Sequence, residues 1–122
     1  NPTLSIGANI PRLASNNTFA GTSNTFSGTV YAGAFQISSD ARLKENVQTL
    51  NNAVDTVLQL RGVSYVKNGK PEIGLIAQEV EEVCPLIVKE HRGYKAVQYD
   101  RIGVLLLPII KEQEEKIKNA QR

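Results

Sequence analysis

The fold class is decided by the stretch GVSYVKNGKPEIGLI, residues 62–76. Residues 62–67 alternate as a half-buried strand does. Asn68-Gly69 is the strongest two-residue signal for a hairpin turn, because both residues tolerate the positive φ angles that such a turn requires. Residues 73–76 are the natural partner strand. We therefore expect an antiparallel β-hairpin here.

Short helices and a second hairpin are expected on either side of this one. In chain order, the other predicted elements are a helical start at 41–50, a helix at 51–60, a helix at 77–83, and strands at 86–90 and 94–99 around the turn 91–93. Asn51 or Asn52 can cap the second helix, and Gly62 can end it. Pro85 ends the third. The pattern predicts a small α+β domain.

A long helix is expected to run from Asp100, its cap, toward Arg122, with a kink at Pro108. Read in heptads, it places Gly103, Ile110 and Ile117 at a, and Leu106, Gln113 and Ala120 at d. The apolar side is broad near the start and thin after Ile110. This suits a helix that continues into a parallel coiled coil, with a seam at Leu106, Ile110, Gln113 and Ile117. A terminal helix docked on its own domain fits the pattern equally well.

The first 38 residues differ chemically from the rest. They hold one charged side chain, Arg12, whereas residues 39–122 hold the other 25. The block Asn-Thr-Phe-x-Gly-Thr occurs at 17–22 and again at 24–29, a spacing of seven. Such short β-formers divided by Gly predict tiny strands and turns that bury too little to fold alone but could stack with identical chains. The alternative is a flexible linker.

Composition excludes several classes of protein. A net charge of +2 gives no basic field for nucleic acid. The longest apolar run, residues 104–110, is far below the roughly 20 residues of a membrane span. A single Cys84, expected to be a buried apolar side chain, and a single His91 give no internal disulfide and no zinc site. We expect no cofactor, no metal, and a chain cut from a longer protein.

The composition changes at Ser38-Ser39-Asp40-Ala41-Arg42-Leu43-Lys44. A lysine can act as base for a serine nucleophile when its amine is neutral, which burial or a nearby positive charge favours, and Arg42 is close in sequence. Within one α-helix, five residues would separate the two side chains by about 140°. Ser39 must therefore lie in an extended lead-in, with Lys44 reaching it from the same or another chain. The alternative is a plain helix cap.

Four linked motifs over residues 39–122 resemble one family. The motifs are Ser39-Asp40-x-Arg42-Leu43-Lys44-Glu45-Asn46, then Leu58-x-Leu60-Arg61-Gly62-Val63-x-Tyr65, then Gly74-Leu75-Ile76-Ala77-Gln78-Glu79-Val80 with Pro85 and Val88, then Val97-x-Tyr99 before a long helix. This is the self-cleaving intramolecular chaperone domain at the C-terminus of phage tailspikes, endosialidases and neck appendage proteins. The first 38 residues resemble the end of a trimeric β-helical stalk.

The resemblance implies a function and a site. The domain, residues 39–122, would form a homotrimer and register the upstream stalk of the same polypeptide, residues 1–38. It would then release itself between Ser38 and Ser39, with Ser39 as nucleophile and Lys44 as base. The stalk would belong to the virion, in a phage tail or neck appendage, and the chaperone would act in the host cytoplasm during assembly.

Other residues and other functions remain open. Asp40 and Arg42 match the motif and are assigned support, by orienting Lys44 or biasing its charge. Glu79 and His91 are weaker candidates, since each is as well explained as an ordinary surface residue. Rival functions are a non-cleaving trimeric tail-fibre tip that binds a receptor, the related domain of membrane-anchored eukaryotic transcription factors, and a plain dimerisation module. The Asn/Thr/Gly-rich segment 1–38 argues against the transcription-factor hypothesis.

Overall fold

The computed structural model describes residues 14–121. The chain divides into two units, Asn1–Lys44 and Glu45–Arg122, each with its own contacts. In the first unit, residues 14–38 contain bends and turns but no helix or strand, and their side chains are exposed. Phe26 and Phe35 are 65% and 77% exposed. The tiny strands expected here are therefore not formed in a single chain over these described residues.

The first hairpin of the second unit forms where the sequence predicts it. Strand β1 (Val63–Lys67) pairs antiparallel with β2 (Lys70–Gly74), and Asn68 and Gly69 have φ angles of 51° and 76°. The second strand begins earlier than the predicted 73–76. The two-residue turn fixes the register Lys67↔Lys70, so the ladder ends at Val63↔Gly74.

Two short helices occupy the expected places with different ends. Helix α1 (Ala53–Leu58) follows Asn52, whose φ of 59° leaves it without a side-chain cap bond. The helix ends at a right-handed C-cap, Gln59, which needs no glycine, so the predicted stop at Gly62 is wrong. Helix α2 (Ala77–Val83) ends before Pro85 as predicted.

The predicted helical start at 41–50 is reduced to one 3₁₀ turn, η1 (Ala41–Leu43). Lys44 is already extended, with φ −121° and ψ 147°. Asn46 has a φ of 51°, a left-handed conformation that an α-helix cannot pass through. The chain therefore leaves the turn directly.

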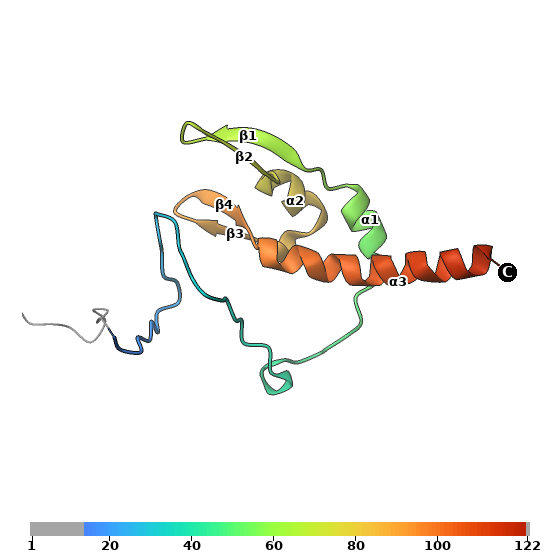
Figure 1. Cartoon of the computed structure of the whole chain (residues 1–122), viewed down its shortest axis with the longest axis horizontal. Coiled ribbons are helices and arrows are strands. Elements are labelled where there is room, and N and C mark those ends of the chain that lie inside the picture. The colour runs from blue at the N-terminus through green and yellow to red at the C-terminus, as the bar shows by residue number, and fades with distance from the viewer. Residues whose placement is uncertain (1–13, 122) are drawn as a thin grey trace, which may run out of the picture. The chain divides into compact units, whose positions relative to one another are not determined.

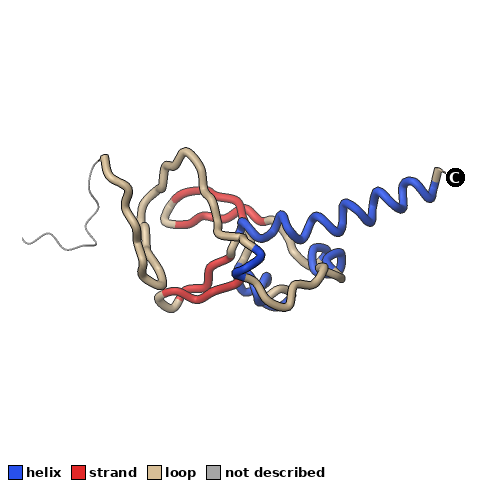
Figure 2. The backbone as a smooth tube through the Cα atoms, turned by 90° about the horizontal axis from the view of Figure 1, so that it is seen from below, coloured by secondary structure: helices blue, strands red, loops and turns tan. Residues whose placement is uncertain are grey.

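The second hairpin follows a 3₁₀ turn, η2 (Pro85–Ile87), and is shorter than predicted. It pairs β3 (Val88–His91) with β4 (Tyr94–Val97) around Arg92 and Gly93, which have φ angles of 53° and 82°. Figures 1 and 2 both show the tips of the two hairpins pointing away from the C-terminal end of the chain.

The long helix α3 (Ile102–Ala120) is continuous through Pro108 (Figure 1). A 3₁₀ turn, η3 (Tyr99–Arg101), precedes it, and Arg101 is its N-cap. The predicted cap at Asp100 is therefore wrong, because Asp100 lies inside that turn. None of the helices in the described range 14–121 is long and apolar enough to cross a bilayer.

A small core holds the second unit together. Val80, Ile87 and Val88 are its buried cluster, and half-buried Cys84 packs against it. Ala53 of α1 and Leu105 of α3 are also buried, and α1 contacts α3. The second unit is therefore a mixed α+β domain with two small hairpins and a long C-terminal helix.

Candidate active site

A single capped turn forms the segment where the composition changes. Asp40 is extended, with φ −64° and ψ 136°, and its Oδ1 accepts a hydrogen bond from the Arg42 N–H at 2.8 Å. The Leu43 N–H donates to the Asp40 carbonyl at 3.0 Å, and the Lys44 N–H donates to the Ala41 carbonyl at 3.1 Å. The chain enters extended, turns once, and leaves extended.

This turn brings Ser39 and Lys44 of one chain into contact. Lys44 Nζ donates a hydrogen bond to Ser39 Oγ at 2.6 Å. An α-helix would have placed the two side chains on different faces. The contact forms because only one 3₁₀ turn separates Ser39 from Lys44, and both flanking residues of that turn are extended. The same atoms can exchange a proton if the amine becomes neutral.

The side chains of Arg42 and Asp40 form an ion pair within the turn. Arg42 Nε and Nη2 lie 3.0 Å and 2.9 Å from the two carboxylate oxygens of Asp40. The side-chain and backbone hydrogen bonds from Arg42 hold the pKa of Asp40 below its usual value. The hydrogen bond to Asp40 raises the pKa of Arg42. The Asp40 carboxylate therefore compensates the positive charge of Arg42.

The turn itself is exposed to solvent in the single chain. Ser39 and Lys44 are both exposed, and the Arg42 side chain is 89% exposed. A lysine amine is neutralised by removal from water or by uncompensated positive charge. The turn itself provides neither burial nor an uncompensated positive charge beside Lys44.

The two weaker candidates lie in the second unit. Glu79 of α2 accepts two hydrogen bonds from Arg61, at 2.8 Å and 2.9 Å, and these lower the pKa of Glu79. His91 ends β3 opposite Tyr94. Glu79 is therefore engaged in a structural ion pair. Within the described residues, no group of three or more His, Cys, Asp or Glu is arranged to hold a metal ion.

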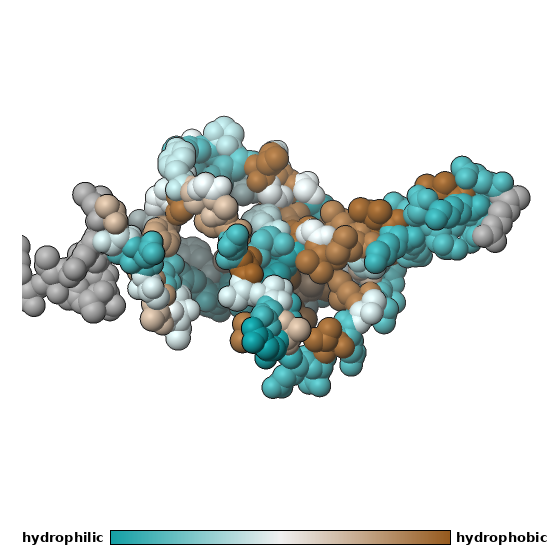
Figure 3. Space-filling view, turned by 60° about the horizontal axis from the view of Figure 1, so that its bottom comes forward, coloured by the Kyte–Doolittle hydropathy of each residue, from teal (hydrophilic) through white to brown (hydrophobic). Residues whose placement is uncertain are grey.

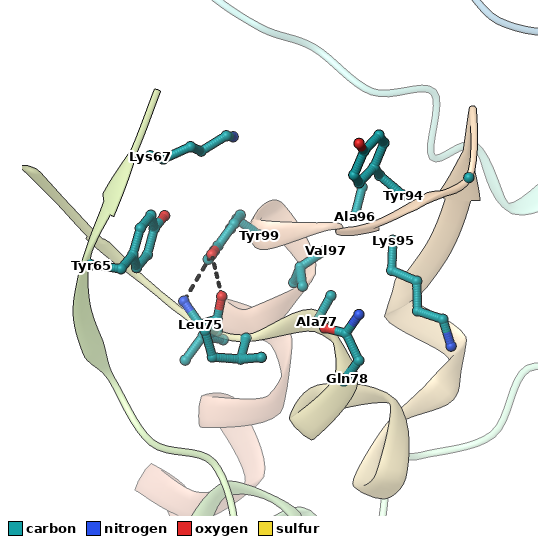
Figure 4. A pocket seen from close by; sticks show the side chains of 12 residues that line it. Tyr65, Lys67, Leu75, Ala77, Gln78, Tyr94, Lys95, Ala96, Val97 and Tyr99 are labelled. Atoms are coloured by element: carbon teal, nitrogen blue, oxygen red, sulfur yellow. Dashed lines mark hydrogen bonds between the residues drawn. The ribbon is translucent and has the colours of Figure 1, made fainter. Parts of the chain in front are cut away.

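The structure adds a tyrosine lock that the sequence patterns do not predict. Tyr99 Oη accepts a hydrogen bond from the Leu75 N–H at 2.9 Å and lies 3.4 Å from the Leu75 carbonyl oxygen, to which it donates (Figure 4). This lock ties the end of the first hairpin to the start of α3. Tyr65 and Tyr99 also line an open hollow of about 510 Å³. The motif Val97-x-Tyr99 marked the tyrosine without indicating its partner.

The predicted seam of α3 is largely uncovered. Leu106, Ile110 and Ile117 are 41%, 61% and 54% exposed, and Gln113 is exposed as well. Figure 3 shows apolar surface gathered along the first half of α3 and mostly polar surface farther on. The first part of the helix packs on its own domain through Ile102 and Leu105. A fully docked terminal helix is therefore excluded for the single chain.

The Ser–Lys turn and the elements that follow it, as far as β3, match a known family. The segment 39–89 matches the peptidase family S74, described as the chaperone of endosialidase. The match begins at Ser39. The resemblance inferred from the sequence motifs is therefore confirmed over this segment.

Three phage proteins are similar to the chain over longer or comparable stretches. The long tail fiber protein Gp37 of Salmonella phage S16 is 29% identical over 109 residues, which cover 78% of this chain and 15% of that protein. The Gp37 proteins of Enterobacteria phages K3 and T2 are each 38% identical over 66 residues, covering 48% of this chain and 5% of each of them. The chain thus spans a small fraction of the length of these relatives.

Proposed function

We propose that this chain carries an intramolecular chaperone of a phage tail fibre or related appendage. Residues 39–122 associate as a homotrimer, register the stalk that ends at residue 38, and then leave by cleavage between Ser38 and Ser39. The family description and the tail fibre names of the relatives support a trimerisation chaperone and a virion component. The stalk stays in the virion, and the chaperone acts in the host cytoplasm and is released.

The observation that carries the cleavage step is the 2.6 Å contact between Lys44 Nζ and Ser39 Oγ. Neutral Lys44 takes the hydroxyl proton as Ser39 Oγ attacks the carbonyl carbon of Ser38. The Ser38–Ser39 peptide bond breaks, its nitrogen receives the proton from Lys44, and an ester joins Ser38 to Ser39 Oγ. Water then hydrolyses that ester, leaving a Ser38 carboxylate and the free Ser39 hydroxyl.

The association step is supported by apolar side chains that the single chain leaves in water. The exposed seam of α3 has the heptad spacing of a coiled coil. The buried cluster Val80, Ile87 and Val88 is small, and so small a core leaves a domain marginally stable. Covering the seam with other copies removes more apolar surface from water. Ser39 and Lys44 are exposed in the single chain, so the proposed mechanism also requires the other chains of the trimer to cover the turn and desolvate Lys44.

Intact mass over time tests the cleavage. The 122-residue chain is purified fresh beside Ser39→Ala, Lys44→Ala and Ser38→Ala. We expect fragments of residues 1–38 and 39–122 from the wild type and from Ser38→Ala, since position 38 supplies only its carbonyl. Ser39→Ala and Lys44→Ala stay whole. Native mass of Ser39→Ala, which keeps the chain intact, reports the trimer.

The outcomes separate the rival functions. A wild type that stays whole but trimeric would favour the non-cleaving tail-fibre tip. A cleaving chain that is monomeric at micromolar concentration would contradict the chaperone proposal. Cleavage that persists in Lys44→Ala would remove Lys44 as the base.

A further inference from the structure

We infer that Asp40 and Arg42 are positioning residues for the proposed cleavage: their paired side chains lock the turn that holds Lys44 against Ser39. This inference rests on the proposed function and deepens it. It concerns how the Ser39–Lys44 contact is maintained.

The hydrogen bonds that hold the turn all lie within the turn itself. Both of its backbone hydrogen bonds, and the three bonds that Asp40 accepts through its side chain, join atoms within residues 40–44. A single 3₁₀ turn is marginal by itself, because one or two backbone bonds do not offset the ordering of its residues. The Asp40–Arg42 pair therefore contributes the local order that the backbone alone lacks.

The two residue types suit this task. Asp40 is short enough for one carboxylate to accept the Arg42 backbone N–H and both guanidinium donors. The planar guanidinium fixes its partner with two parallel bonds, which a lysine ammonium cannot do. Lys44, by contrast, is a long side chain with several rotatable bonds, so its Nζ samples many positions unless the turn holds Ser39 within its reach.

The pair is unsuited to the proton transfer itself. Both Asp40 oxygens are occupied by Arg42, and these bonds keep the pKa of Asp40 low, so the carboxylate does not compete with Lys44 for the Ser39 proton. Asp40 and Arg42 act on the reaction through the position of Lys44.

The test compares first-order cleavage rates in the full chain. Asp40→Asn keeps an oxygen that can cap the turn but removes the ion pair, and Arg42→Gln removes it from the other side. We expect each to slow cleavage roughly 10-fold, since misplacing a reacting group is that costly. Arg42→Lys retains the positive charge without the two parallel hydrogen bonds, so its cleavage rate should lie between those of the wild type and Arg42→Gln. The double variant should be no slower than the slower single one, because both remove the same interaction.

A matched control comes from another exposed ion pair. Glu112 pairs with Lys116 at 3.2 Å on α3, so Glu112→Gln removes one negative charge and one ion pair elsewhere. We expect an unchanged rate. Thermal unfolding of each variant checks that the second unit is intact. Wild-type rates in Asp40→Asn and Arg42→Gln, with Ser39→Ala and Lys44→Ala inert, would overturn the positioning role and leave the proposed function standing.

A wild type that never cleaves would instead overturn the proposed function, and the positioning role is then read by NMR. An NOE between Ser39 Hβ and Lys44 Hε is expected in the intact chain and should be lost in Asp40→Asn. An NOE that persists in Asp40→Asn would contradict the inference.

Discussion

Gly74 lies close to the side-chain hydroxyl groups of Tyr65 and Tyr99. A Cβ built at this position would fall 2.6 Å from Tyr99 Oη and 2.9 Å from Tyr65 Oη. Tyr99 occupies that place because it bonds the backbone of Leu75. Burial, with smaller contributions from Tyr99 and Glu72, raises the pKa of Tyr65, so its hydroxyl stays neutral. The absence of a side chain at residue 74 is thus part of the tyrosine lock.

We expect Gly74→Ala to destabilise the second unit by about 1–3 kcal/mol, as forced overpacking does. The added methyl group would displace Tyr99 Oη and weaken its bonds to Leu75. Urea unfolding of the Ser39→Ala chain measures the effect. Gly62→Ala is the matched control, since a Cβ there meets nothing within 4 Å. Equal stability of the two variants would show that the close approach carries no cost.

At the scale of elements, an ion pair connects α2 to the segment that leads into β1. Arg61 bonds both carboxylate oxygens of Glu79, 18 positions later in the sequence. Hydrogen bonds from Arg61 lower the pKa of Glu79 from its usual 4.5, against a smaller opposing effect of desolvation. A carboxylate with a lowered folded pKa stabilises the fold above the unfolded pKa. That contribution is lost as pH falls through the folded pKa.

We therefore expect the wild type to lose more stability than Glu79→Gln when the pH falls from 7 to 3. The glutamine cannot ionise, so it lacks this contribution at both values. The two chains should differ at pH 7 and converge at pH 3 in urea unfolding. Glu82→Gln removes a charge from the same helix and should follow the wild type. A constant difference between wild type and Glu79→Gln across this range would show that the ion pair is not what the substitution removes.

Elements governed by local chemistry could be predicted from the sequence, and those governed by distant partners could not. Asn68-Gly69 and the stop before Pro85 act on their own neighbours, so the turn of the first hairpin and helix α2 lie where expected. The predicted cap of α3 at Asp100 is wrong because a 3₁₀ turn, Tyr99–Arg101, precedes the helix. The motif singles out Asp40 and Arg42, but the two hydrogen bonds between their side chains depend on the 3₁₀ turn, which the sequence does not predict. The Tyr99–Leu75 bond spans 24 positions and leaves no periodic signal.

On the scale of the whole molecule, the two segments pose different folding problems. Residues 14–38 are exposed and carry no charged side chain, and their block occurs twice, so a shift of seven residues gives an alternative register. If these residues form the proposed stalk, its strands would depend on contacts between chains and would fold slowly. A C-terminal unit with its own core can form first and hold three chain ends together, which raises their effective concentration. The proposed cleavage would afterwards leave the stalk kinetically trapped, because refolding would lack its nucleus.

The proposed trimer raises the question of which chain supplies the base. Because Lys44 Nζ reaches Ser39 Oγ within one chain at 2.6 Å, we expect each chain to cleave itself. Ser39→Ala and Lys44→Ala chains, unfolded, mixed and refolded together, form trimers that contain both an intact serine and an intact lysine in different chains. Within-chain chemistry predicts no cleavage in this mixture, whereas wild type carried through the same refolding should cleave. Native mass confirms that the chains have mixed. Release of a fragment beginning at Ser39 from the Lys44→Ala chain would show that Lys44 acts across the trimer, and the contact within one chain would then describe the resting turn before assembly.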